Sequence, residues 1–308
     1  MESIHKYEVR PFGKFPLTGC FDEAYISAIS SFGINPALYL LSEKNELGKN
    51  EKGFFFSVGR QIELPEFEAN VGIESLQERF GDCATEKVID RLKNDYLVIA
   101  RVREISGVNI ETGRKTQRSF SEHWVLIYGY DSAKNQLIVL EHSNNLSTKY
   151  APCLVTTEEF ENAYKMAQMK EEAYESDIYS LRPDRENNST PQNEELFAKF
   201  ISKYRSDLQK EQKALEMFLD EAEPSSMYIS VLNQVIKKYQ KEQWLYKEMG
   251  LNLESVDLLL RELFLLRTFC VRAQFNGLTE PDEKIKIHVN SALECCQRFY
   301  TEKKNAGF

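Results

Sequence analysis

The sequence has no surplus of positive charge, no long apolar run and no paired cysteines. Its 39 lysines and arginines face 48 aspartates and glutamates, so the net charge is −9 at pH 7. Because nucleic acids are bound through basic surfaces, this balance argues against a nucleic-acid partner. No stretch approaches the roughly 20 apolar residues that cross a membrane, and the N-terminus has no apolar signal-peptide core. We therefore expect a cytoplasmic protein that binds neither nucleic acid nor membrane.

Cysteine and histidine are also scarce. The six cysteines are irregularly spaced and form no CxxC pair, which indicates free thiols and not a disulfide framework. With only four histidines, a zinc site would need ligands from distant parts of the chain. We expect no metal and no resident cofactor.

The sequence contains periodic apolar residues over most of its length, enough to form two domains. Strand and helix patterns mix up to about residue 181, and from about residue 190 the pattern is helical throughout. The segment RPDRENNSTPQNEE between them has two prolines and no apolar period, which is typical of a linker. We therefore predict a first domain of residues 1–187 and a helical bundle domain of residues 188–308, with the boundary near Asn188.

Apolar periodicity places the elements of both domains. A helix is predicted from Cys20 to Gly33, because Phe21, Tyr25 and Ile29 recur at helical spacing and a glycine typically follows the last turn. In the first domain we further predict helices at residues 72–81, 83–94 and 156–168, and strands at 53–64, 96–105, 123–131, 136–143 and 177–183. In the second we predict one long helix from Phe197 to Leu219, ended by Pro224, and helices at 227–250, 255–277 and 286–303.

Cys20 stands at the start of its predicted helix. There, unpaired amides and the positive end of the helix dipole favour a thiolate over a thiol, which makes a nucleophile. The neighbouring carboxylates of Asp22 and Glu23 oppose this effect. The alternative is that Cys20 is a small buried packing residue.

A base and a carboxylate occur together in the segment HWVLIYGYDSAKNQLIVLEHS. His123 begins one predicted strand, and Glu141 arrives eighteen residues later on the next strand of a hairpin joined by SAKN. If the register keeps parity, both side chains lie on one face near the same end of the pair. The carboxylate would then orient the imidazole, and the imidazole would deprotonate Cys20, an arrangement of nucleophile, base and orienting group.

Two alternatives stay open at this point. A register slip of one residue would present His142 and Asn144 in place of His123's partner. Cys83 is a rival nucleophile, because it follows a candidate helix N-cap, Asp82. The remaining cysteines lie in apolar patterns and are interpreted as packing residues: Cys153, Cys270, Cys295 and Cys296.

A helix-initial cysteine, then a histidine opening a strand that runs into GYD, then a hairpin, resembles the papain-like cysteine enzymes. HWVLIYGYD is close to their histidine segment. Over residues 10–181 the chain is most similar to the bacteriocin-leader-peptidase-like branch, which includes the butirosin-type acyltransferases, and more narrowly to the amide synthases of closthioamide-type assembly. The resemblance implies an α+β papain-like fold, in which the cysteine helix packs on an antiparallel sheet, followed by the all-α helical bundle.

The resemblance also implies a reaction. Butirosin-type acyltransferases take an acyl group from a carrier-protein thioester onto cysteine and pass it to an amine, forming an amide. For this chain it implies an acyl-Cys20 intermediate in thiotemplated, nonribosomal antibiotic biosynthesis. The partners would be an acyl or peptidyl carrier protein, which brings its own phosphopantetheine, and an amine acceptor. The alternatives are a cysteine peptidase or thioester hydrolase, and a non-catalytic binding protein on the same scaffold.

Two positions depart from the family pattern. Papain-like peptidases have a glutamine about six residues before the nucleophile as an oxyanion-hole donor, whereas here that position is Lys14 and no glutamine precedes Cys20. Because a thioester is already activated, a weaker oxyanion hole harms acyl transfer less than amide cleavage. The third group is Glu141, where the clan more often has Asp or Asn.

A basic loop, GRKTQR, precedes the histidine strand in this otherwise acidic chain. Its Arg114, Lys115 and Arg118 would suit a phosphopantetheine arm or an acidic carrier protein. A solvated hairpin loop explains the same residues.

Overall fold

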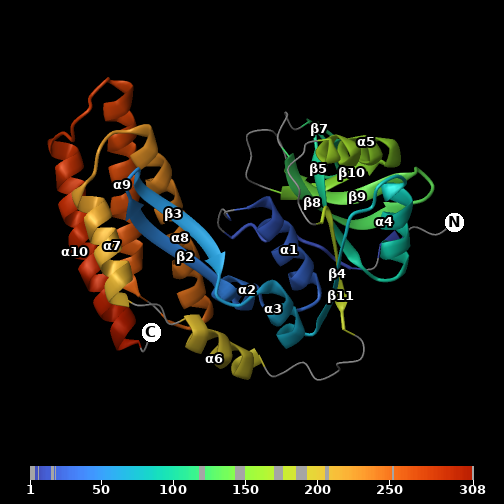
Figure 1. Cartoon of the computed structure of the whole chain (residues 1–308), viewed down its shortest axis with the longest axis horizontal. Coiled ribbons are helices and arrows are strands. Elements are labelled where there is room, and N and C mark those ends of the chain that lie inside the picture. Colours follow the sequence, from blue (N-terminus) through green and yellow to red (C-terminus); the bar gives the residue numbers. More distant parts are fainter. Residues whose placement is uncertain are drawn as a thin grey trace. The chain divides into compact units, whose positions relative to one another are not determined.

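The structure, a computed structural model, is of mixed α+β class and divides into two compact units (Figure 1). The sheet unit comprises Met1–Pro36 and Pro65–Asn193, and the helical unit comprises Ala37–Leu64 and Glu194–Phe308. The structure describes residues 4–5, 7–14, 17, 19–117, 122–142, 150–169, 176–184, 193–204, 208–251 and 253–306.

An antiparallel sheet forms the centre of the sheet unit. Its strand order in the described residues is β4-β11-β5-β8-β9-β10-β6-β7, and β1 also pairs with β8. The strands are β1 (Ile4–His5), β4 (Ile73–Glu78), β5 (Leu97–Arg103), β6 (Ser106–Asn109), β7 (Lys115–Gln117), β8 (Glu122–Asp131), β9 (Gln136–His142), β10 (Tyr150–Thr156) and β11 (Ile178–Pro183).

This sheet curls strongly. β5 ends at Arg103 and β6 begins at Ser106, so the link between them can reach about 11 Å at 3.8 Å per residue. In a flat sheet the order would separate these strands by four spacings of about 4.8 Å, roughly 19 Å. The short link therefore requires the sheet to bend back on itself.

The sheet is covered on both faces (Figure 1). Side chains of β5 that point to one face, Val98, Ala100 and Val102, share a buried cluster with Val88 and Phe160. Val88 belongs to α4 (Ala84–Lys93) and Phe160 to α5 (Thr157–Gln168), so these two helices cover this face. The unit also contains helix α3 (Leu64–Val71).

Helix α1 (Cys20–Ser31) covers the other face of the sheet. The ring of Phe21 packs edge-on against Trp124 of β8 and Tyr179 of β11, with centroids 5.3 and 5.6 Å apart. Successive strand residues point to opposite faces, so Trp124 and Tyr179 are turned away from the cluster of α4 and α5. These aromatic contacts fix the start of α1 against β8.

The helical unit combines long amphipathic helices with a β-hairpin. Its buried cluster is supplied chiefly by leucines and aromatic residues of four helices, among them Leu232, Leu263 and Phe299. The elements are α2 (Pro36–Ser42), β2 (Glu43–Asn50), β3 (Gly53–Arg60), α6 (Asn193–Tyr204), α7 (Leu208–Asp220), α8 (Ser226–Glu248), α9 (Glu254–Phe275) and α10 (Glu283–Asn305).

The hairpin β2–β3 explains why the units differ from the expected domains of residues 1–187 and 188–308. Three of its apolar side chains, Leu47, Phe54 and Phe56, pack against the buried cluster of the helices. Because the apolar side chains of the hairpin are buried against the helices, residues 37–64 belong to the helical unit although they lie within the first third of the sequence.

Two further element predictions are wrong. Residues 72–81, predicted as a helix, contain strand β4, whose residues pair with β11 from Ile73 opposite Pro183 to Glu78 opposite Ile178. Pairing with a distant strand outweighs local helix preference here. The single helix predicted from Phe197 to Leu219 is assigned as α6 and α7, and residues 205–207 between them lie outside the described part. Strands β1, β2, β6, β7 and β10 and helices α2 and α3 were not predicted.

Other element predictions are confirmed. Helix α4 falls within the predicted 83–94, and α5 begins after Thr156, whose hydroxyl caps it by accepting from the Glu159 amide at 3.2 Å. None of the helices in the described part of the chain has the length and apolar composition needed to cross a membrane.

A buried ion pair attaches the hairpin to α8, and its removal should destabilise the helical unit. Nζ of Lys241 lies 3.1 Å from Oε2 of Glu43, and each side chain is 5% exposed. Glu43→Ala leaves the lysine charge buried and unpaired, so we expect a loss of about 3 kcal/mol. Urea unfolding followed by Trp244 fluorescence, in a Trp124→Phe background, measures it.

The matched control is the double variant Glu43→Leu with Lys241→Met, which removes both charges and should recover most of the lost stability. A single variant within about 0.5 kcal/mol of the parent would show that the pair contributes little.

Candidate active site

The local sequence sets where α1 begins and ends. Ala24 and Ile26 are fully buried, and Gly33 follows the last turn with a φ of +82°, a conformation that glycine adopts without strain. At the other end the N-cap is Gly19, so no side chain caps the helix. Cys20 is therefore the first helical residue, at the positive end of the helix dipole.

The thiol of Cys20 lies beside the start of β8. Its Sγ accepts a hydrogen bond from the backbone N–H of Trp124 at 3.3 Å, across 104 positions of sequence. Trp124 directly follows His123. A donor aimed at sulfur stabilises the thiolate over the thiol, so this backbone amide adds to the effect of the helix terminus.

His123 and Glu141 form a buried pair. Nε2 of His123 lies 2.5 Å from Oε2 of Glu141, and the two residues are 2% and 3% exposed. An ionised carboxylate can only accept hydrogen bonds, so we assign the proton to the imidazole, with the Nε2–H donating to Glu141. The pair fixes both the orientation of the imidazole ring and the nitrogen that bears the proton.

A β-bulge in β8 sets the register of this pair. Near the turn Asp131 is opposite Gln136, whereas further along Ile127 is opposite Val139. Between these positions the register shifts by one residue, which leaves Tyr128 as the extra residue on β8.

The bulge decides which side chain His123 meets. Continued beyond Leu126 and Leu140, the register puts Val125 opposite Glu141, so His123 and Glu141 share a face. If Tyr128 were instead paired with Val139, His142 would lie opposite Val125 and take the place of Glu141. The prediction that His123 and Glu141 lie on the same face of the hairpin is thus confirmed. The alternative register, which would present His142 and Asn144 on that face, is wrong.

A buried carboxyl holds the segment that leads to Cys20. Oε1 of Glu23 accepts a hydrogen bond from the Phe12 backbone N–H at 3.0 Å. Desolvation by burial raises the pKa of Glu23 to about 7, although the amides of Gly13 and Phe12 favour the carboxylate. Glu23 thus ties residues 12–13 to the first turn of α1.

The described part of the chain shows no polar contact that joins the other predicted site residues to this site. Lys14, Arg114 and Lys115 are exposed, and no hydrogen bond or ion pair within the described residues joins them to Cys20, His123 or Glu141. Arg114 lies in the turn between β6 and β7, and Lys115 is the first residue of β7, opposite Val108. Arg118, Asn144 and the side chain of His142 lie outside the described residues.

The remaining cysteines fit roles other than that of Cys20. Burial, followed by the charge of Glu141, raises the pKa of the Cys153 thiol to about 11, and burial raises those of Cys270 and Cys296 to about 12. These thiols are neutral at pH 7, in agreement with their interpretation as packing residues. Cys295 is half-buried and its pKa is also raised by burial.

Cys83 is exposed and itself occupies the N-cap of α4, with a φ of +65°, so the expectation that Asp82 caps this helix is wrong. The thiol offers no side-chain cap hydrogen bond to the helix. No histidine of the described residues is hydrogen-bonded to it, whereas Cys20 adjoins the histidine strand.

Three parts of the site were not predicted: the Trp124 amide, the bulge at Tyr128 and the anchor at Glu23. A backbone N–H has no sequence signature. The bulge did have one, because Gly129 is an isolated glycine inside a strand pattern.

In the described residues, no group of three or more His, Cys, Asp or Glu side chains could hold a metal ion. In comparisons with known proteins, the chain matches no protein-family model and no curated protein. The geometry of Cys20, His123 and Glu141 is therefore the basis for a functional assignment.

The register of this pair can be tested by deleting Leu140 from β9, beyond the bulge. Deletion should bring His142 opposite Val125, turn Glu141 away from His123 and slow the alkylation of Cys20 by iodoacetamide about tenfold. Exchanging the two residues in the deletion background, with Glu141→His and His142→Glu, should restore the rate. A deletion variant that keeps the parent rate would contradict the register argument.

The raised pKa of Glu23 predicts a pH-dependent stability of the sheet unit. The folded carboxyl titrates near 7 and the unfolded one near 4.5, so the folded state binds more protons between these values. Stability should therefore fall by about 3 kcal/mol as pH rises from 4.5 to 7, and Glu23→Gln should lack this loss. Urea unfolding followed by Trp124 fluorescence, in a Trp244→Phe background, measures it; parallel pH profiles would refute it.

Proposed function

We propose that the chain is a cysteine-dependent acyltransferase of papain-like fold, which forms an amide through an acyl-Cys20 intermediate. The observation that carries the proposal is the buried His123–Glu141 pair beside the helix terminus at which Cys20 accepts a hydrogen bond from Trp124. Nucleophile, base and orienting group come from α1, β8 and β9.

The first half of the reaction loads the enzyme. Since Nε2 of His123 is paired with Glu141, Nδ1 takes the proton of Cys20, and the thiolate attacks the carbonyl of a carrier-bound thioester. The new C–S bond forms as the old C–S bond breaks. The departing pantetheine thiol takes the proton from His123, so the products are acyl-Cys20 and the free carrier thiol.

The second half transfers the acyl group to an amine. A neutral amine attacks the acyl-Cys20 carbonyl, and His123 takes one of its protons as the C–N bond forms. Breaking the C–S bond returns the pair of electrons to sulfur, and the proton from His123 restores the thiol. The amide is released without an added cofactor, because the thioester supplies the driving force.

Stabilisation of the tetrahedral oxyanions would come from the backbone N–H of Cys20 at the start of α1. The family's glutamine is replaced by Lys14, which is exposed. A thioester or thioester-like intermediate needs less such help than an amide, and this supports acyl transfer over peptide hydrolysis.

The proposed donor is an acyl or peptidyl carrier protein. Arg114 and Lys115 are exposed at one turn of the sheet unit, where an acidic carrier or its phosphate could contact them. A cytoplasmic location would keep the catalytic thiol reduced.

Intact-protein mass spectrometry tests the acyl-enzyme. Incubation with an acyl-pantetheine thioester should add one acyl mass to the wild type and none to Cys20→Ala. Loading should be at least about 100-fold slower in His123→Ala, because the base that activates the thiol is lost. Cys83→Ala is the matched control and should load normally.

Addition of amines then separates transfer from hydrolysis. Amide should accumulate as the acyl-enzyme decays, in proportion to amine concentration. An adduct that persists in Cys20→Ala would overturn the proposed nucleophile. Release of free acid at a rate independent of amine would instead assign a thioester hydrolase, and failure of any donor to load would favour a binding protein.

A further inference from the structure

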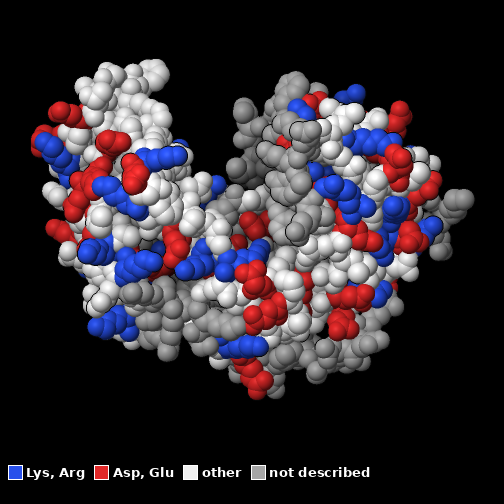
Figure 2. Space-filling view, in the orientation of Figure 1, with Lys and Arg blue, Asp and Glu red and all other residues white. Residues whose placement is uncertain are grey.

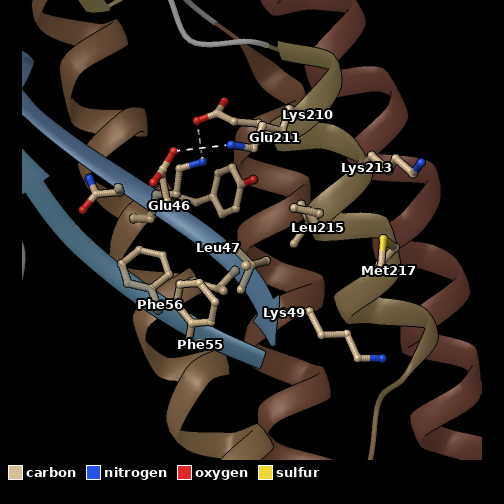
Figure 3. Close-up of a pocket in the computed structure, with 16 residues that line it drawn as sticks. Glu46, Leu47, Lys49, Phe55, Phe56, Lys210, Glu211, Lys213, Leu215 and Met217 are labelled. Atoms are coloured by element: carbon tan, nitrogen blue, oxygen red, sulfur yellow. Dashed lines mark hydrogen bonds and ion pairs between the residues drawn. The ribbon is translucent and has the colours of Figure 1, made fainter. Parts of the chain in front are cut away.

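A cavity of about 400 Å³ lies in the helical unit, between the β2–β3 hairpin and helices α7 and α8 (Figure 3). Leu47, Phe55 and Phe56 line it from the hairpin, and Leu215 and Met217 from α7. None of these residues belongs to the candidate active site. The walls are thus largely apolar, as in most sites for small organic molecules.

One wall depends on a glycine. Gly48 and Phe55 are opposite each other in the hairpin, and a Cβ on residue 48 would lie 2.6 Å from Cζ of Phe55. The absence of a side chain on Gly48 lets the aromatic ring lie across strand β2. Phe55 remains 41% exposed, so apolar surface at the edge of the cavity is available to a ligand.

Charged side chains gather at one end of the cavity. In Figure 3, Glu46, Lys210 and Glu211 converge there, and the ion pairs Lys210–Glu46 and Lys238–Glu211 have N···O distances of 3.7 and 3.1 Å. The first pair is loose and its side chains are 74% and 43% exposed. An exposed pair of this kind is worth less than about 1 kcal/mol, so the negative end of a ligand can compete with Glu46 for Lys210.

Lysines outnumber glutamates around this cavity. Within the described residues, this holds for the residues that line the cavity together with their ion-pair partners. The lysines among them are Lys44, Lys49, Lys210, Lys213, Lys238 and Lys303, and the glutamates are Glu46, Glu211, Glu221 and Glu242.

This surplus is local. The whole chain has a net charge of −9, and on the face of the helical unit seen in Figure 2 basic and acidic side chains are interleaved. A positive excess beside apolar walls is complementary to a molecule with an apolar body and a negative end.

We propose that this cavity binds a small amphipathic anion, an acyl chain or ring that ends in a carboxylate or phosphate. Its volume lies at the lower end of the roughly 300–1,000 Å³ of small-molecule sites, which suits a ligand and not a protein segment. The apolar part packs between Phe55, Phe56 and Leu215, and the anionic end faces Lys210. The proposal does not depend on catalysis at Cys20.

Isothermal titration calorimetry of the full chain tests it with three probes that share an eight-carbon chain: octanoate, octyl phosphate and octylammonium. Octanoate or octyl phosphate should bind at least about tenfold more tightly than octylammonium, because only the anions complement the lysine surplus. The tighter of the two anions identifies the head group. Equal binding of octylammonium would overturn the proposal.

Variants locate the binding. Ala214 lines the cavity, and Ala214→Phe should fill it and abolish the heat of binding. Phe55→Ala, at a half-exposed position outside the buried cluster of the helices, should weaken binding as well. Lys210→Gln should weaken it about threefold, whereas Lys304→Gln, on the exposed surface of α10, should leave it unchanged. Unaltered affinity in both Ala214→Phe and Phe55→Ala would place any binding elsewhere and refute the proposed site.

Discussion

The contact between His123 and Glu141 is the constraint around which the sheet unit is arranged. An imidazole and a carboxylate that are almost fully buried lose most of their hydration, and only a close, well-oriented pair offsets that cost. This explains why the details of β8 matter. The bulge at Tyr128 brings Glu141 onto the histidine's face, and the packing of Phe21 on Trp124 sets Cys20 at the same end of the strand. The chemistry we propose needs all three features at once.

Much of the site could be predicted from the sequence, because its parts lie on strongly patterned elements. Cys20 precedes an apolar helix stripe, His123 opens an apolar strand, and Glu141 lies at matching parity across a hairpin. The sequence could not decide whether Glu141 or His142 shares the face of His123, because this depends on the bulge in β8. Gly129, an isolated glycine in the strand pattern, was the only sequence signal for that bulge. The Trp124 hydrogen bond is a backbone contact, so no residue type announces it.

The fold was less predictable where distant segments decide the outcome. Strand β4 is specified by its pairing with β11, which lies a hundred or more positions further along the chain, and its local pattern resembled a helix. The hairpin β2–β3 buries Leu47, Phe54 and Phe56 against helices that begin beyond residue 200. The same hairpin that departs from the expected domain boundary also forms one wall of the cavity in the helical unit. Under our two proposals, covalent chemistry belongs to the sheet unit and recognition of an amphipathic anion to the helical unit.

The central claim is that Nε2 of His123 donates a hydrogen bond to Glu141 and that Nδ1 of His123 faces the thiol of Cys20. Nitrogen-15 NMR of the histidine-labelled protein, before and after methylthiolation of Cys20, tests it most directly. The account predicts a protonated, exchange-protected Nε2 in both states and an Nδ1 resonance that changes when the thiol is blocked. An Nε2 proton that exchanges freely with water, or an Nδ1 resonance that does not respond to the modification, would contradict it.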